Sequence, residues 1–413
     1  MRVNNRWFQL VASVVVMIMI ANLQYAWTLF VKPLQTGTGW KLSDIQWAFT
    51  LFILFQTWVQ PTQGWLIDRM GPRVFISIAG VLCGIGWGGL GYASSLPMLY
   101  TLYVLAGIGA ALVYGGSIGS ALKWFTDRRG LASGIIAAGF GGGTALFIPV
   151  IAWMLTHQGY KATFLWTGIF QGLVILIVAQ FLRHPAAPAA QAGSAQIAAG
   201  PTVLRQSHFT TPEMLRTPQF YLLYLAFVLM ATGGLLVTAN AGPMAQSWGI
   251  PASALALATS LNALANGASR VSWGWISDRM GRERAMGTAF ALQALCLFLV
   301  LTLGRLSGTL FTVTLVLTFF TWGETFSLFP SILGDYFGTR HATSNYGLLY
   351  SAKGVASIIG GGVAALLYES FGSWSALLYG SAAFALVASA IVFGLRASAA
   401  TRDASIGVPV PAK

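Results

Sequence analysis

Charge is scarce in this chain, and acidic charge is the scarcest. Only 8% of the 413 residues are charged, and only 10 of them are acidic, against 23 basic ones. A typical soluble domain has roughly a quarter of its residues charged. The shortage therefore excludes an ordinary soluble globular protein.

Reactive and metal-binding side chains are also few. There are two cysteines, Cys83 and Cys296, and both lie in apolar runs, so we expect no disulfide framework. Four histidines form no metal-ligand pattern, and the sequence has no nucleophile with a neighbouring base and no nucleotide-binding loop. We expect neither an enzyme nor an ATP-driven pump, and no resident cofactor or metal.

Apolar residues dominate what remains: 56% of the chain is hydrophobic and the mean hydropathy is +0.70. The chain contains twelve apolar segments of about 20 residues, the length that a helix needs to cross a membrane. We predict an all-α membrane protein with twelve transmembrane helices. The predicted spans are Trp7–Phe30, Leu42–Leu66, Val74–Tyr92, Pro97–Leu122, Leu131–Thr156, Thr163–Leu182, Phe220–Ala241, Ala252–Ile276, Ala285–Leu303, Leu310–Leu333, Asn345–Tyr368 and Trp374–Leu395.

Basic residues gather on one side of this predicted topology. With both termini cytoplasmic, only Lys32, Lys41, Lys161 and Arg305 fall on the outer side, as the positive-inside rule requires. The rule explains the net charge of +13 without nucleic acid. We expect a multi-pass protein of the cell (inner) membrane, surrounded by lipid and monomeric.

One motif occurs twice, about half the chain length apart. Gly-x-x-x-Asp-Arg-x-Gly-x-Arg begins at Gly64, and a close copy begins at Gly274. Glycines allow tight turns, and an Asp–Arg pair at helix ends can latch neighbouring helices in one of two conformations. The expected cytoplasmic gating residues are Gly64, Asp68, Arg69, Gly71, Arg73, Gly274, Asp278, Arg279, Gly281 and Arg282.

The repeat predicts two pseudo-symmetric halves of six helices, with the substrate bound between them. The halves cover residues 1–182 and 218–396. Residues 183–217 lack apolar periodicity and are expected to form a cytoplasmic linker that ends in a short helix. Residues 397–413 are expected to be a flexible cytoplasmic tail.

Lys353 places a positive charge inside a predicted span. A central lysine costs about 2.5 to 3.5 kcal/mol, so such a residue indicates a functional site. Tyr350 and Tyr346 share its helical face, at positions i, i+4 and i+7.

Arg270 is the second cation within a span, and it shares a face with Asn262 and Asn266. Its planar guanidinium suits a carboxylate, although a structural ion pair with Glu324 is the alternative. Asn262 can equally bridge helices. Aligning the two copies of the motif places Gln60 opposite Arg270, and a second alignment places Phe140 opposite Lys353. The cations therefore belong to the ligand rather than to the shared scaffold.

Further polar and aromatic residues lie within the spans. Each glutamine can either line a pocket or join helices, and the sequence leaves this open. Trp322 and Phe326 share one face of their span, while Glu324 points to another side. Glu324 can carry a proton, remain a neutral buried acid or pair with Arg270. The glutamines that can either line a pocket or join helices are Gln24, Gln46, Gln56 and Gln60. Tyr25 follows Gln24 directly, and Tyr114 lies within another span.

The repeated motif resembles the signature of the major facilitator superfamily, and the resemblance covers essentially the whole chain. Further stretches resemble the oxalate:formate antiporter family, among them Gln24-Tyr25-x-Trp27, Asn266-Gly267 with Arg270, and Ala352-Lys353. The resemblance implies that Arg270 and Lys353 clamp a dicarboxylate. It also implies a pocket lined by Gln24, Tyr25, Gln46, Tyr114 and Trp322, to which we add Asn266, Phe140, Phe326 and Tyr350.

Three positions depart from that family pattern. Phe140 and Phe326 stand where the oxalate transporter has tyrosines, and Glu324 replaces a glycine. Each lost hydroxyl removes a hydrogen bond worth about 0.5 to 1.5 kcal/mol. We expect a secondary transporter that exchanges oxalate, or a similar small dicarboxylate, for formate. The alternatives are a proton-coupled symporter of lactate, pyruvate or formate, and a carboxylate sensor that transports nothing.

Overall fold

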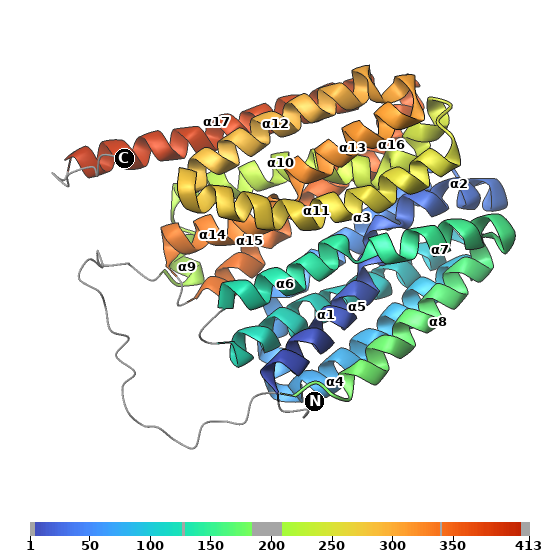
Figure 1. Ribbon diagram of the computed structural model, residues 1–413, viewed down its shortest axis with the longest axis horizontal. Helices are drawn as coiled ribbons and strands as arrows, with labels where there is room; N and C mark the ends of the chain where they lie inside the picture. Colours follow the sequence, from blue (N-terminus) through green and yellow to red (C-terminus); the bar gives the residue numbers. More distant parts are fainter. Residues whose placement is uncertain (1–4, 126–128, 184–208, 339–340, 406–413) are drawn as a thin grey trace.

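The computed structural model describes residues 5–125, 129–183, 209–338 and 341–405, and these ranges are helical with short connections and no strand. The long helices lie side by side along a common direction (Figure 1). The chain enters α1 and leaves α17 at the same end of this bundle, which we call the terminal end. The helices are α1 Arg6–Tyr25, α2 Trp27–Thr38, α3 Leu42–Trp58, α4 Gln60–Gly89, η1 Leu90–Tyr92, α5 Leu96–Trp124, α6 Arg129–Gly142, α7 Thr144–His157, α8 Gly159–Ala179, α9 Thr211–Met214, α10 Pro218–Ser247, α11 Ala252–Met280, α12 Arg282–Thr302, η2 Gly304–Leu306, α13 Gly308–Trp322, α14 Thr325–Phe337, α15 Ala342–Ser357, η3 Ile358–Val363, α16 Ala364–Phe371 and α17 Ser375–Ser405.

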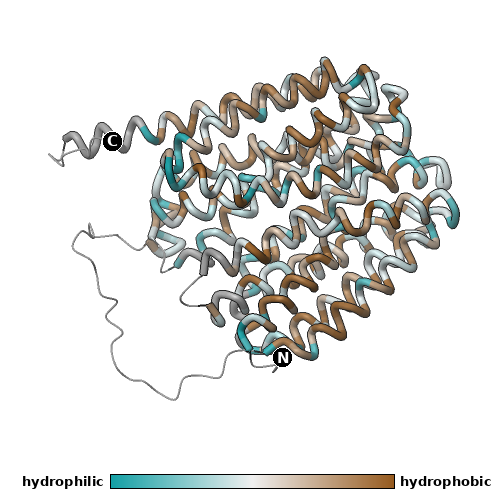
Figure 2. Tube along the Cα trace, viewed as in Figure 1, coloured by the Kyte–Doolittle hydropathy of each residue, from teal (hydrophilic) through white to brown (hydrophobic). Residues whose placement is uncertain are grey.

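Within the described residues, ten helical segments are long and apolar enough to cross a membrane. Figure 2 shows hydrophobic residues along the helices and hydrophilic ones concentrated toward their ends. Two predicted spans are not among the ten. The first part of the span predicted over 42–66 is α3, only 17 residues long, which ends just before Gln60-Pro61. The other predicted span lies in α11, where polar residues lower the hydropathy. The twelve-span count therefore stays a prediction.

Glycine turns the chain at the same place in both copies of the motif. Gly71 has φ 73° and Gly281 has φ 87°, values that only glycine adopts readily. The loop expected between Leu66 and Val74 is thus reduced to one non-helical residue, Gly71, because a single glycine can reverse the helix direction.

The helices at the two ends of residues 209–405 are α9 and α17, and the end of α17 differs from the expected boundary. The last helix continues to Ser405 rather than ending at residue 396, because residues 397–400 include alanines, the strongest helix formers. The expected short helix forms as α9. Its capping box lets the Thr210 backbone N–H and hydroxyl donate to Glu213, and these bonds hold the pKa of that carboxyl below its usual range.

Helices from the two parts of the chain pack together: α3 contacts α15 and η3, α11 contacts α6 and α7, and α10 contacts α2. Hydrogen bonds join them at the end opposite the terminal end. The Glu369 carboxylate accepts from the Ser43 backbone N–H (2.9 Å) and hydroxyl (2.7 Å), which caps the first turn of α3 from another helix. The Thr50 hydroxyl donates to Ser357 and accepts from the Gly362 N–H. These bonds tie α3 to the helices α15, η3 and α16 of the later part of the chain.

Candidate functional site

Lys353 is fully buried in α15, at the contact with α1 and α3. Its ammonium donates to Gln24 Oε1 (2.9 Å), Gln56 Oε1 (3.0 Å) and the Tyr350 hydroxyl (3.4 Å). All three acceptors are neutral. A buried charge without a counter-charge is unfavourable, so this environment favours the approach of an anion.

Arg270 brings the second cation from α11 and is 5% exposed. Its Nη1 donates to the Ala137 carbonyl of α6 (2.9 Å), and its Nη2 donates to Asn266 Oδ1 (3.1 Å), one turn earlier on α11. These two bonds orient the guanidinium. Its Nε has no hydrogen-bond partner among the described residues, so the Nε–H remains available beside the second N–H of each Nη.

Both cations lie over the same aromatic ring. The Phe326 ring centroid is 5.0 Å from Arg270 Cζ and 5.5 Å from Lys353 Nζ. Phe140 lies 5.9 Å from the Lys353 ammonium. The two charges predicted from separate spans therefore lie on either side of one shared aromatic neighbour, Phe326.

The predicted aromatic residues form one continuous cluster around these cations. Phe140 contacts Tyr25 and Tyr114, each at 5.5 Å between ring centroids, and Tyr114 stacks on Tyr350 at 5.8 Å. Phe326 lies 6.2 Å from Tyr350 and 5.2 Å from Trp322. A small cavity beside the cluster is lined by residues that include Tyr25, Thr28, Asn262 and Phe319.

Several buried donors in this cluster have no partner among the described residues. They are the Tyr25 hydroxyl, Trp322 Nε1 and Gln24 Nε2, in addition to Arg270 Nε. Buried polar groups in proteins are normally hydrogen-bonded. A small carboxylate has about four acceptor positions on two oxygens, and it matches this set of donors better than a cation or an apolar molecule does.

Two glutamines of α3 behave differently from the sequence prediction. Gln46 is engaged elsewhere: it accepts from Trp27 Nε1 (3.0 Å) and donates to the Ala239 carbonyl (2.7 Å) and Asn240 Oδ1 (3.1 Å). It joins helices here, so its role in the pocket stays a prediction. Gln56 was left out of the predicted site, yet it contacts the Lys353 ammonium. The only sequence feature that pointed to a role for Gln56 was its spacing of four residues from Gln60, which puts both glutamines on one helical face.

Glu324 lies fully buried where α13 ends and α14 begins. Its Oε1 accepts a hydrogen bond from the Thr325 hydroxyl (3.4 Å), and its Oε2 has no partner within the described ranges. In the part of the chain that the structure describes, no ion pair joins Glu324 to Arg270 or Lys353. The structural Arg270–Glu324 pair considered from the sequence is therefore not formed, because Arg270 turns toward α6.

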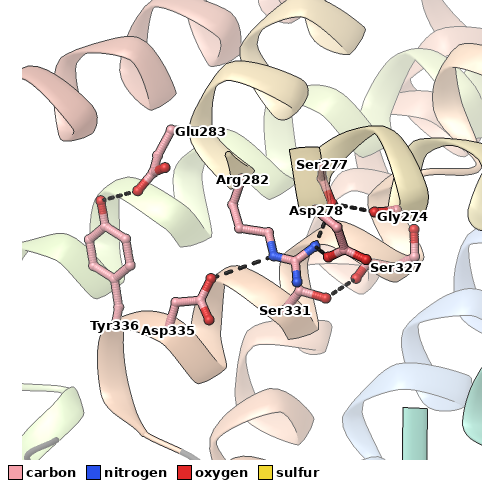
Figure 3. A network of polar contacts seen from close by, with 9 residues as sticks. All are labelled: Gly274, Ser277, Asp278, Arg282, Glu283, Ser327, Ser331, Asp335 and Tyr336. Atoms are coloured by element: carbon pink, nitrogen blue, oxygen red, sulfur yellow. Dashed lines mark hydrogen bonds and ion pairs between the residues drawn. The ribbon is translucent and has the colours of Figure 1, made fainter. Parts of the chain in front are cut away.

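The second copy of the motif forms a polar network between α11, α12 and α14 (Figure 3). Arg282 pairs with Asp278 (2.7 Å) and lies 3.5 Å from an Asp335 carboxylate oxygen. It also donates to the Ser277 hydroxyl. The arginine thus ties the turn at Gly281 to the neighbouring helix.

The other gating residues have separate contacts. In the first copy, Arg73 Nε donates to Oε1 of Gln180, the residue directly after α8 (2.7 Å). In the second, the Arg279 guanidinium stacks on Trp275, 3.6 Å from the ring centroid. The surroundings of Gly64 and the Asp68 side chain lie outside the described part of the structure. The gating role of both copies stays a prediction.

Comparison with known proteins gives one family and a set of relatives. The family model described as Major Facilitator Superfamily matches residues 12–241 and again residues 222–410. The chain is 41% identical to the oxalate:formate antiporter of Oxalobacter formigenes over 374 residues, 91% of this chain and 88% of that protein. Monocarboxylate transporter 12 of Xenopus laevis is 26% identical over 81% of this chain and 76% of its own. Monocarboxylate transporter 13 of Bos taurus is 24% identical over 85% and 80%.

Proposed function

This chain belongs to the major facilitator superfamily, and from that premise we propose that it exchanges oxalate, or a similar small dicarboxylate, for formate across a membrane by alternating access. The observation that carries this proposal is the meeting of Arg270 and Lys353 over Phe326, with no acidic ion-pair partner for either cation among the described residues. Two fixed positive charges fit one dianion.

The same charges favour exchange over net transport. Moving two desolvated cations through the conformational change without an anion is costly, whereas a bound dianion neutralises both. A carrier of this kind reorients readily only when it is loaded. Formate on the return path supplies one negative charge.

We also propose the finer architecture: twelve transmembrane helices in two halves, both termini cytoplasmic, and a monomer in the inner membrane. The family model matches the chain twice, and both copies of the motif turn at a glycine with positive φ. The distribution of basic residues supports the orientation. On this assignment the terminal end faces the cytoplasm.

A ligand screen on the purified protein tests the substrate class. We expect the dianions oxalate and malonate to bind more tightly than formate, lactate or pyruvate, because only a dianion offers one carboxylate to each cation. Isothermal titration with the five anions at one ionic strength measures this order. Tighter binding of lactate or pyruvate than of oxalate would refute the assignment.

Glu324 supports a second candidate, a proton-coupled monocarboxylate symporter, because a fully buried carboxyl in the second part of the chain can carry a proton. Exchange predicts little uptake into vesicles that contain no anion, with or without an inward proton gradient. Symport predicts gradient-driven uptake that Glu324→Gln abolishes. We expect the first result, and the exposed Glu213→Gln serves as the matched control.

A further inference from the structure

A second set of buried polar atoms lies next to the Lys353 site, on the side of the terminal end. Gln63 in α4 is 3% exposed and Ser117 in α5 is 1% exposed. Within the described residues, neither amide atom of Gln63 and no hydroxyl of Ser117 or Tyr346 has a hydrogen-bond partner, and the same holds for Gln60 Nε2. None of these atoms belongs to the dicarboxylate clamp.

These side chains come together because glycine leaves room for them. A Cβ atom on Gly115 of α5 would lie 1.7 Å from Gln63 Oε1 and 3.1 Å from Gln60 Oε1, so both amides rest against the bare backbone there. Gly347 of α15 lies against Pro61, where an added Cβ would be 3.5 Å from the proline Cα. Helices α4, α5 and α15 therefore enclose one group of polar side chains, which we call the polar column: Gln60, Gln63, Ser117 and Tyr346.

The column is continuous with the central site. Tyr346 lies 5.6 Å from Tyr350, which is hydrogen-bonded to Lys353. Gln60 follows Gln56, the other partner of Lys353, by four residues at the junction of α3 and α4. Tyr346 precedes Lys353 along α15, and Gln60 and Gln63 of α4 follow Gln56 of α3, so these side chains lie between Lys353 and the terminal end.

The chemistry of the column suits an anion. Unpartnered buried polar groups are rare and destabilise the fold, so a polar ligand that bonds to them during function would remove this cost. Gln60 Nε2, Gln63 Nε2 and the hydroxyls of Ser117 and Tyr346 can donate, no acidic residue is among them, and rotation of the Gln63 amide turns its unpartnered oxygen away from an anion. We infer that Gln60, Gln63 and Tyr346 form a relay site that holds a small carboxylate on its way between Lys353 and the terminal end.

This inference rests on the proposed exchange of carboxylates, and the test separates the two. The double variant Gln60→Met/Gln63→Met keeps side-chain volume and removes the donors. We expect its oxalate affinity to match wild type, while labelled-oxalate exchange in proteoliposomes slows about tenfold, the effect of one lost hydrogen bond to a charged group. Gln158→Met, at the exposed end of α7 and outside the column, should exchange at the wild-type rate.

The outcomes are distinct. If wild type neither binds nor exchanges oxalate, the proposed function fails. If wild type exchanges oxalate and the double variant does so equally fast, the relay alone is overturned. Thiol labelling of the variant Gln63→Cys distinguishes an anion relay from a column that holds only water. In an anion relay, a negatively charged thiol reagent should label this cysteine faster than a positively charged one, and oxalate should slow the labelling. Equal labelling rates for the two reagents would overturn the anion relay.

Discussion

Arg270→Lys is expected to weaken oxalate binding at least about 100-fold, although it keeps the positive charge. A lysine ammonium lacks the planar fork that binds a carboxylate through two parallel hydrogen bonds, and each such charged bond contributes about 1.5 to 3 kcal/mol. The change also leaves the Ala137 carbonyl and the Asn266 amide oxygen without their present donor.

Titration calorimetry on the purified variant measures this loss. Arg305→Lys, at an exposed position in η2, is the matched control and should bind oxalate like wild type. A thermal unfolding curve shows whether Arg270→Lys is still folded. A folded Arg270→Lys protein with unchanged affinity would contradict the clamp.

Lys353→Ala is expected to weaken oxalate binding at least about 100-fold and to weaken formate binding by a smaller factor. The dianion needs both cations, whereas a monoanion still finds the guanidinium of Arg270. The variant frees the amide oxygens of Gln24 and Gln56, which remain able to bind water.

Competition binding with oxalate and formate, on wild type and Lys353→Ala side by side, measures the ratio of the two losses. Lys161→Ala, an exposed lysine, is the control. An equal loss for both anions would indicate that Lys353 supports the structure rather than one carboxylate of a dianion.

The broad fold could be predicted from the sequence because the membrane acts on average properties of a span. Hydropathy located the long helices, and the repeated glycine motif located the turns at Gly71 and Gly281. Boundaries were less predictable, since one glycine can replace a whole loop and an alanine-rich tail can extend a helix. The polar residues of α11 lower its hydropathy, so this predicted span is not among the ten apolar helical segments.

The site was predictable where charge marked it and less so where it did not. A cation within a span is conspicuous, so Arg270 and Lys353 were found directly, and their aromatic neighbours followed from the resemblance. Glutamine costs less to bury than a charge, so the residues alone did not separate Gln56, which contacts Lys353, from Gln46, which joins helices, and the resemblance implied a pocket role for Gln46 only. That difference depends on how α3 rotates against α15 and α10.

The most direct test of the central claim is counterflow in proteoliposomes. Vesicles carrying the purified protein and loaded with unlabelled oxalate or formate are diluted into labelled oxalate, beside empty vesicles. The account predicts rapid accumulation of label in both loaded sets and almost none in empty vesicles. Equal uptake into empty and loaded vesicles, or no uptake into any, would contradict it.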